Sequence, residues 1–590
     1  MKYLTEKLSD EVNKAFKEAG FDGAKGTVIF SNRPDLCEFQ CNGAMAVAKQ
    51  MKKNPLEIAS AVAEALKDSP CFSSAEAVKP GFLNLNVRED FLIECLSEMY
   101  GREKLGAADD TEKKTVIVDY GGPNVAKPLH IGHLRAAIIG EAIKRMHGFL
   151  GHRVIGDIHM GDWGLQMGLI IAELKLRDPS LPYFDPDYKG EYPSDPPFTL
   201  SELEEIYPTA SERSKTDEDF KECAMNETYK LQHGDRGNLA LWHKIMEVSV
   251  ADLKKNYERL NVDFELWKGE SDADPYIAPM VKELKDKGFA KESQGALVVD
   301  VSEETDKKEI PPCMILKSDG AALYTTTDLA TLVQREQDYH PDKVVYVVDK
   351  RQQLHFTQVF RTAKKTGIVP PDTELEFLGF GTMNGRDGKP FKTREGGVMR
   401  LETLISDTVK EMYKKMEDND GISLPAEEMR ETAEIIALAA IKYGDLSNQA
   451  SKDYVFDLDK FTSFEGNTGP YILYTVVRIK SVLRKYEEKY GAMGGFSLRT
   501  PESSVEKALM LCLSSFAPTV KSATNELAPH RLCAYMYELA NLFNRFYHET
   551  RIIAEEDSEK RNGWISLLLL TLKAFSYCID MLGMKEAERM

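Results

Sequence analysis

The hydrophobic pattern changes at Thr115–Tyr120, which has the character of a buried β-strand. A turn rich in Gly, Pro and Asn follows at residues 121–124, and a helical pattern then extends from about Ile131 to Leu150. A second strand is predicted at Arg153–Ile155. Strand, tight loop, helix and strand in this order are typical of a doubly wound parallel sheet, in which ligands bind beyond the carboxyl ends of the strands.

The same pattern divides the chain into three predicted domains. Residues 1–110 predict a small mixed α/β domain with strands at Thr27–Phe30 and Phe82–Val87. Residues 111–425 form the domain of the parallel sheet, with an insertion around 175–290 and further sheet-like segments at 323–325, 344–348 and 375–378. Helical periodicity dominates residues 426–590, which predicts a separate helical bundle.

Composition narrows the class of protein. The chain has 590 residues, of which 42% are hydrophobic, so it can bury large cores and wholesale disorder is excluded. Its formal net charge of -19 argues against a protein that coats nucleic acid by bulk attraction. A local basic face stays possible, because phosphate contacts need only a few well-placed cations.

Cysteine usage and apolar runs point to a cytoplasmic protein. The closest cysteine pair, Cys37 and Cys41, has no second pair nearby to complete a zinc site, so we expect no metal site of the protein's own and nine reduced thiols. The lysine- and glutamate-rich start predicts no signal peptide. The apolar run Trp564–Leu572 is too short to span a bilayer, which favours a buried core helix and no membrane partner.

The sharpest local motif is His-Ile-Gly-His at residues 130–133, where the loop after the first sheet strand becomes a helix. A helix start offers unpaired N–H groups and a positive dipole end, which suits phosphate. Gly132 lets a base or phosphate approach, while His130 and His133 can donate hydrogen bonds to developing charge and Lys127 adds a cation. Two histidines at this spacing could instead ligate a metal, although no glutamate follows as in a zinc protease, and so short a string also arises by chance.

Further motifs accompany this tetrapeptide along the whole chain. They occupy residues 118–120, 123–128, 130–135, 161–164, 166, 324–328, 351–352, 355, 465–468 and 588–590. Together they resemble the signature of class I arginyl-tRNA synthetases over essentially the full length. The resemblance implies a Rossmann-like catalytic domain, an N-terminal α/β domain that reads the tRNA D-loop, and an all-α bundle that reads the anticodon. It also implies ATP as a substrate, Mg²⁺ on the pyrophosphate side, L-arginine and tRNA(Arg) as partners, and a monomer.

One motif departs from the wider class. Class I synthetases usually carry a Lys-Met-Ser-Lys-Ser loop, whereas residues 388–394 here read Gly-Lys-Pro-Phe-Lys-Thr-Arg. Which of Lys389, Lys392 and Arg394 contacts ATP therefore stays open. In such family members the lysine that matches Lys127 is thought to supply part of the missing charge.

The resemblance also implies roles for residues around the amino acid. Arginine presents a planar fork of five donors that asks for carboxylates in a fixed arrangement. Asp119 and Asp328 are expected to hold this guanidinium together with the Tyr324 hydroxyl, and one helical turn would place Tyr324 and Asp328 on one side. Asn124 and Gln352 are expected at the α-amino and carboxylate end. Taken singly, each aspartate could instead be a residue that caps a turn, and Tyr324 could be an ordinary core residue of a sheet.

For catalysis the resemblance implies charge stabilisation by His130, His133, Lys127 and Lys392, without a covalent enzyme nucleophile. For tRNA it implies contacts of Phe82 and Asn84 with a loop base. Tyr454, Arg478 and Arg545 are expected to meet the anticodon region, although a solvated charged face is the simpler interpretation of each single cation. Activation of arginine is expected to wait for tRNA.

Three rival functions remain at this point. A tRNA-binding paralogue without catalysis is disfavoured because His130, Gly132, His133, Asn124 and Asp328 are all intact. A class I synthetase for another amino acid would not explain the carboxylates expected around a cation. A small nucleotidyltransferase could share the His-Ile-Gly-His loop but not the long helical C-terminal third.

Overall fold

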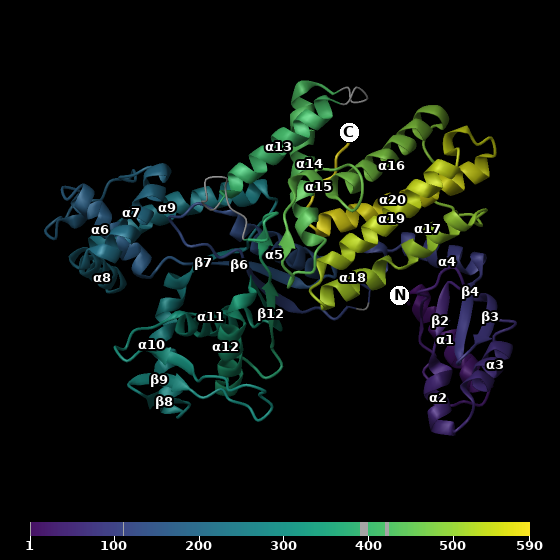
Figure 1. Ribbon diagram of the computed structural model, residues 1–590, viewed down its shortest axis with the longest axis horizontal. Helices are drawn as coiled ribbons and strands as arrows, with labels where there is room; N and C mark the ends of the chain where they lie inside the picture. The colour runs from purple at the N-terminus through teal and green to yellow at the C-terminus, as the bar shows by residue number, and fades with distance from the viewer. Residues whose placement is uncertain (1, 110, 390–398, 419–423) are drawn as a thin grey trace.

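The computed structural model describes residues 2–109, 111–389, 399–418 and 424–590. Its elements form a central parallel sheet with flanking helices, a helical insertion, a C-terminal helical bundle and a separate N-terminal lobe (Figure 1). In this view the insertion lies at the left end and the N-terminal lobe at the lower right, with the sheet and the bundle between them. The long molecule therefore presents widely separated surfaces on either side of its sheet.

The N-terminal lobe is an antiparallel sheet covered by helices. Its four strands have the order β1-β2-β4-β3. The elements are α1 (Leu4–Glu18), β1 (Val28–Phe30), β2 (Phe39–Cys41), α2 (Gly43–Met51), α3 (Pro55–Ala65), β3 (Phe72–Val78), β4 (Phe82–Val87) and α4 (Glu89–Tyr100). Along β4 the residues alternate between buried and half-exposed, so Phe82 and Asn84 share the half-exposed face.

The central sheet has five parallel strands in the order β12-β11-β5-β6-β7. Its elements are β5 (Thr115–Tyr120), α5 (Ile131–Phe149), β6 (Arg153–Met160), β7 (Leu266–Gly269), α11 (Tyr324–Tyr339), β11 (Lys343–Asp349), α12 (Gln353–Thr366) and β12 (Glu374–Phe380). After β5 the chain adds β6 and β7 on one side of it, and β11 and β12 later join on the other side. The crevice at the carboxyl ends of β5 and β11 is therefore the topological switch point, where such folds bind ligands.

Two groups of elements are inserted between the strands of this sheet. The first, on the left of Figure 1, contains α6 (Leu165–Arg177), α7 (Leu200–Thr216), α8 (Glu218–Gln232) and α9 (Arg236–Arg259). The second contains α10 (Glu270–Asp286) and the small antiparallel sheet of β8 (Ala290–Ser293), β9 (Ala296–Val299) and β10 (Cys313–Leu316).

The rest of the chain is almost entirely helical. It comprises β13 (Met383–Asn384), α13 (Leu401–Glu417), α14 (Ala426–Leu446), β14 (Tyr454–Val455), α15 (Leu458–Phe461), α16 (Gly469–Tyr490), α17 (Ser504–Ser514), α18 (Phe516–Asn525), α19 (Pro529–Glu549) and α20 (Ser558–Met581). By length and composition α20 could cross a membrane, but 67% of its apolar window is buried inside the protein. Trp564, Leu568 and Phe575 pack in the core, which confirms the predicted buried helix.

The parallel sheet and the helical C-terminal part are confirmed, and one predicted strand is wrong. Residues 323–325 do not form a strand, because Tyr324 begins helix α11. The Leu323 N–H donates to Thr326 Oγ1 at 3.1 Å, so a threonine caps the helix. The β-branched threonines favour a strand by local propensity, but the capping hydrogen bond stabilises a helix start here.

Helix α5 is anchored to the C-terminal part by a buried ion pair. Arg135 Nε lies 2.9 Å from Asp445 Oδ2 on α14, and both side chains are almost inaccessible. Arg135 also donates to the Gly381 carbonyl at 2.6 Å, while the Tyr454 hydroxyl donates to Asp445 at 2.8 Å. The guanidinium lies 5.0 Å from the Tyr454 ring centroid. The start of α5 is therefore fixed by contacts from beyond the sheet.

We expect Asp445→Ala to reduce the free energy of unfolding by about 3–5 kcal/mol, because it leaves the buried Arg135 cation without its carboxylate. Asp10→Ala is the matched control, since it removes the exposed pair with Lys2 and should change stability by less than about 0.5 kcal/mol. Urea and thermal unfolding measure both variants. A loss below about 1 kcal/mol in Asp445→Ala would show that this pair does not anchor α5.

Candidate active site

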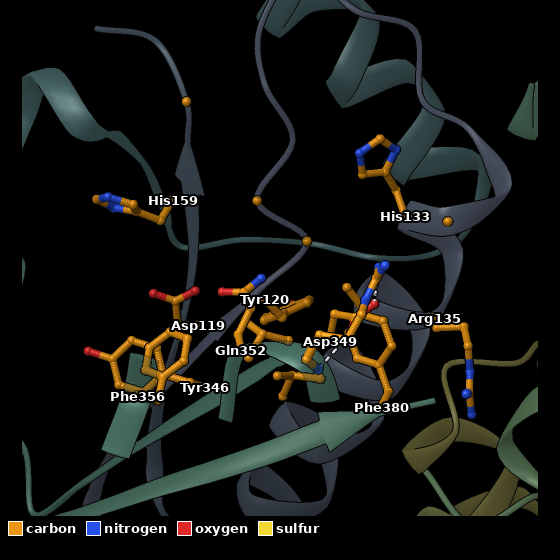
Figure 2. A pocket seen from close by; sticks show the side chains of 18 of the residues that line it. Asp119, Tyr120, His133, Arg135, His159, Tyr346, Asp349, Gln352, Phe356 and Phe380 are labelled. Carbon is orange, nitrogen blue, oxygen red and sulfur yellow. Dashed lines mark hydrogen bonds and ion pairs between the residues drawn. The ribbon is translucent and has the colours of Figure 1, made fainter. Parts of the chain in front are cut away.

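A cavity with a volume of about 710 Å³ lies at the topological switch point. Its walls come from the ends of β5, β6 and β11 and from the starts of α5, α10 and α11. Figure 2 shows His159 and Asp119 toward one end of this cavity and His133 toward the other, with Gln352 between them. The cavity therefore has a carboxylate-bearing end and an imidazole-bearing end.

The loop after β5 holds Asn124 at the cavity wall. Gly161 N–H donates to the Pro123 carbonyl and Val125 N–H donates to the Gly161 carbonyl, both at 3.1 Å. A Cβ atom at Gly161 would lie 2.1 Å from Asn124 Oδ1, so only glycine allows this approach. The amide of Asn124 is thus exposed at a fixed place in the wall.

The two histidines cap the start of α5. The Gly132 N–H donates to His130 Nδ1 at 3.0 Å, and the His130 N–H donates to His133 Nδ1 at 3.1 Å. Because each Nδ1 accepts a hydrogen bond, each neutral ring carries its proton on Nε2. A Cβ atom at Gly132 would lie 2.8 Å from the His130 ring, so this glycine makes room for the cap. The rings lie 3.9 Å apart, centroid to centroid.

These caps correct one part of the phosphate prediction. Ile131 N–H donates to the Met399 carbonyl at 3.0 Å, and His133 N–H donates to the His130 carbonyl at 2.8 Å. The amides at the helix start are therefore already paired, and the expectation that they are free for phosphate is wrong. What remains at this end is the helix dipole and the Nε2–H groups of two imidazoles.

Burial keeps both imidazoles neutral. It lowers the pKa of His130, and it lowers the pKa of His133 to about 3, with the nearby charge of Lys127 acting in the same direction on each. Neutral rings can donate hydrogen bonds without adding a full charge to the cavity.

Asp119 lies at the floor of the cavity in an ion pair that the sequence did not predict. Its Oδ2 lies 2.5 Å from Arg335 Nη2, and the same guanidinium nitrogen lies 2.8 Å from Asp157 Oδ2. Arg335 Nη1 also donates to the Tyr346 hydroxyl at 3.1 Å. Burial raises the pKa of the Asp119 carboxyl, and the attraction of Arg335 opposes this rise. Asp119 is therefore paired with a resident arginine through Oδ2 while it lines the cavity, and its contact with a bound guanidinium stays a prediction.

Two other carboxylates line the same end of the cavity. Asp328 Oδ2 lies 2.5 Å from His355 Nε2, which leaves the second oxygen of Asp328 available. Glu270 begins α10, and among the described residues it has no cationic partner. Burial raises the pKa of Glu270, and the nearby His159 opposes this rise. Both ring nitrogens of His159 are buried without a hydrogen-bond partner.

Glu270 and His159 were not among the predicted site residues. Glu270 directly follows β7, whose four residues include Lys268 and do not form an apolar run, so the strand gave no clear signal. His159 lies near the end of β6, beyond the three residues predicted as strand. Both residues lie at the carboxyl edge of the parallel sheet, and this position would have identified each as a candidate site residue.

The remaining predicted cavity residues are also brought together. Tyr324 and Asp328 both lie on the first turns of α11, and both line the cavity with Gln352. The Tyr324 side chain is 76% exposed, so its hydroxyl is accessible at the rim.

The cations that were predicted to contact the ATP phosphates do not line the cavity where the structure describes them. Lys127 does not line the cavity and instead lies with its Nζ 4.2 Å from the Tyr207 ring centroid. Lys389 is exposed in a turn outside the cavity, where its N–H donates to Asp387 Oδ1 at 3.1 Å. Lys392 and Arg394 lie outside the described residues.

The predicted tRNA residues fall into two groups. Phe82 and Asn84 are half-exposed on β4, and Arg545 is exposed on α19. Arg478 on α16 lies between the Tyr474 and Tyr547 rings, 4.7 and 5.1 Å from their centroids. Tyr454 is buried against Asp445 and Arg135, so its prediction as a tRNA contact is wrong and it is a core residue.

Three family models match the chain in order. They are described as "Arginyl tRNA synthetase N terminal domain" over residues 2–87, "tRNA synthetases class I (R), catalytic domain" over 96–458 and "DALR anticodon binding domain" over 472–590. Curated proteins named arginine–tRNA ligase from Agathobacter rectalis and Alkaliphilus oremlandii are 59% and 54% identical to the chain, each covering 100% of both sequences.

Solved structures agree with these matches. The arginyl-tRNA synthetase of Plasmodium falciparum superposes with a TM-score of 0.81 at 25% identity, covering 100% of both chains. The arginyl-tRNA synthetase of Thermus thermophilus has a TM-score of 0.79 at 22% identity with the same coverage, and it shows the shared fold.

We expect the His133 ring to stay neutral throughout pH 5–8, because burial lowers its pKa to about 3. In the unfolded chain the ring takes up a proton near pH 6.5, so protonation favours unfolding and stability falls as the pH drops below that value. NMR of protein labelled at the histidine Cε1 position, assigned with a His133→Asn variant, measures this directly. A titration midpoint for His133 between pH 5 and 8 would contradict the neutral assignment.

Proposed function

Since the chain belongs to the family of class I arginyl-tRNA synthetases, we propose that its cavity is the place where it carries out both steps of its reaction. The protein is an arginine–tRNA ligase. In the first step the arginine carboxylate attacks the α-phosphorus of ATP, giving arginyl-adenylate and pyrophosphate. In the second step a terminal ribose hydroxyl of tRNA attacks the activated carbonyl and AMP leaves. The observation that supports this site best is the cavity with carboxylates at one end and neutral imidazoles at the other.

The carboxylate end is proposed to hold the guanidinium. Glu270 and the second oxygen of Asp328 can accept hydrogen bonds from a planar fork of donors, and the Tyr324 hydroxyl lies at the rim. Asp119, whose ion pair with Arg335 fixes the floor of the cavity, is proposed to contact the same guanidinium. A neutral amino acid in this place would leave buried charge unpaired, so we expect strong discrimination.

Asn124 and Gln352 are proposed to hold the α-amino and carboxylate end of arginine. Both are exposed in the cavity wall, and Asn124 is fixed by its approach to Gly161. This arrangement would leave the arginine carboxylate pointing toward the imidazole end, where the α-phosphorus must lie. Positioning of this kind lowers the barrier without a covalent enzyme nucleophile.

His130, Gly132 and His133 are proposed to contact ATP. The Nε2–H groups of the two neutral rings can donate to phosphate oxygens as charge develops, and Lys127 is close enough to affect both rings. The contributions of Lys389, Lys392 and Arg394 are proposed from the family resemblance.

Magnesium is proposed to arrive with ATP. No group of three His, Cys, Asp or Glu side chains that could hold a metal occurs within the described part of the chain. This fits an ion that is bound mainly by the phosphates, as Mg²⁺ often is in nucleotide sites. It would neutralise phosphate charge there.

The outer domains are proposed to recognise tRNA(Arg). Phe82 and Asn84 offer a ring and an amide on the open face of β4, and Arg478 and Arg545 offer cations on α16 and α19. We further propose that the enzyme is a cytoplasmic monomer with domains at 1–110, 111–425 and 426–590, and that activation of arginine waits for tRNA.

The direct test is arginine-dependent exchange of labelled pyrophosphate into ATP, with and without tRNA(Arg). We expect exchange with tRNA and little without it. Exchange under both conditions would remove the proposed coupling to tRNA. Folded protein that binds tRNA but gives no exchange would favour a catalytically silent paralogue.

We expect Glu270→Gln to raise the KM for arginine by about 10–100-fold and to leave the KM for ATP unchanged, because it removes a charged acceptor from the guanidinium. Glu283→Gln on the same helix is the matched control, since its carboxylate is exposed and pairs with Lys287. Steady-state aminoacylation at varied arginine measures both variants. An unchanged arginine KM in Glu270→Gln would remove Glu270 from the binding site.

A further inference from the structure

Helix α7 of the insertion contacts a cation beside the imidazole end of the cavity. Lys127 lies in the loop before α5, and its Nζ is 4.2 Å from the centroid of the half-buried Tyr207 ring. Among the described residues, no carboxylate forms an ion pair with Lys127, and its ammonium group contacts the Tyr207 ring instead.

A second contact from the same helix reaches the same place. Glu204 Oε2 lies 3.0 Å from Arg400 Nη2, and the Glu204 side chain is only 11% exposed. Residues three apart share one face of a helix, so Glu204 and Tyr207 point to the same side of α7. Arg400 in turn forms an antiparallel bridge with His130, and the Leu401 N–H donates to the Leu129 carbonyl at 2.9 Å. One face of α7 is therefore fastened to both chain segments that meet at the start of α5.

We propose that Tyr207 is a positioning residue for Lys127: its ring holds the ammonium outside the cavity, on the side of His130 and His133, from where it reaches the ATP phosphates. A free lysine side chain samples many rotamers, and ordering it at the moment of reaction would oppose catalysis. A cation–π contact restricts this freedom without neutralising the charge, as a carboxylate partner would. The Glu204–Arg400 pair keeps α7 at the correct distance. The inference rests on the proposed assignment of Lys127 to the phosphate site.

The contact predicts a specific order among substitutions. Tyr207→Phe keeps the ring and should retain kcat/KM for ATP within about twofold, because the attraction comes from the ring face. Tyr207→Leu removes the ring and should lower kcat/KM for ATP by about threefold to tenfold, with the KM for arginine unchanged. Pyrophosphate exchange at varied ATP, with arginine and tRNA(Arg) saturating, measures these values.

A double-mutant comparison separates positioning from a structural effect. In a Lys127→Ala background, Tyr207→Leu should have no further effect on kcat/KM for ATP. Phe184→Leu is the matched control, because it removes a half-buried ring of the same insertion that lies under Lys175, with 6.0 Å between that Nζ and the ring centroid. It should leave the kinetics unchanged. If Tyr207→Leu does not fold, Tyr207→Met removes the ring but leaves a longer and more flexible side chain to fill its place.

Two sets of results would overturn the inference. Wild-type kinetics in the folded Leu and Met variants would show that the ring does not position Lys127. A loss that Phe does not rescue, or that persists in the Lys127→Ala background, would show that Tyr207 acts on the fold. If Lys127→Ala itself exchanges at the wild-type rate, the assignment of Lys127 to the phosphate site fails instead, and the inference falls with its premise.

Discussion

The chemistry of the cavity depends on the ion pairs that one buried guanidinium, that of Arg335, forms beneath it. Arg335 pairs with Asp119 on β5 and Asp157 on β6, so one oxygen of each sheet carboxylate is already held by a resident cation. Breaking such a buried pair would strand a charge at high cost. Further carboxylates for a bound cation come from the flanking helices. Glu270 at the start of α10 and Asp328 on α11 are in that position, and both line the cavity.

The opposite end of the cavity is organised by neutral donors. His130 and His133 use their Nδ1 atoms to cap α5 and keep their Nε2–H groups for the cavity, while burial keeps the rings uncharged. Helix α5 is itself held by Arg135, which pairs with Asp445 on α14. The imidazole end is thus connected to the C-terminal helices by one buried contact and to the insertion by α7.

Much of this arrangement could be predicted from the sequence. The apolar strands of the parallel sheet and the loop before α5 were located correctly, because buried parallel strands and their Gly-rich turns leave strong local patterns. Tyr324 was assigned to a strand because a run of threonines resembles one locally. The ion pair of Asp119 and the burial of Tyr454 could not be predicted, because their contacts with Arg335 and Arg135, which lie far away in the chain, leave no local signal. Glu270 gave no signal because the strand before it has only four residues and is interrupted by Lys268.

The account depends most on a charge at the carboxylate end of the cavity that only a cationic substrate completes. The most direct measurement compares arginine with citrulline, its neutral isostere, as substrates for tRNA-supported pyrophosphate exchange. The account predicts that kcat/KM for citrulline is lower by at least about 10³-fold, because the ureido group would leave Glu270 and Asp328 without a cation. Exchange with citrulline within about tenfold of arginine would contradict it, since the cavity would then recognise shape without charge.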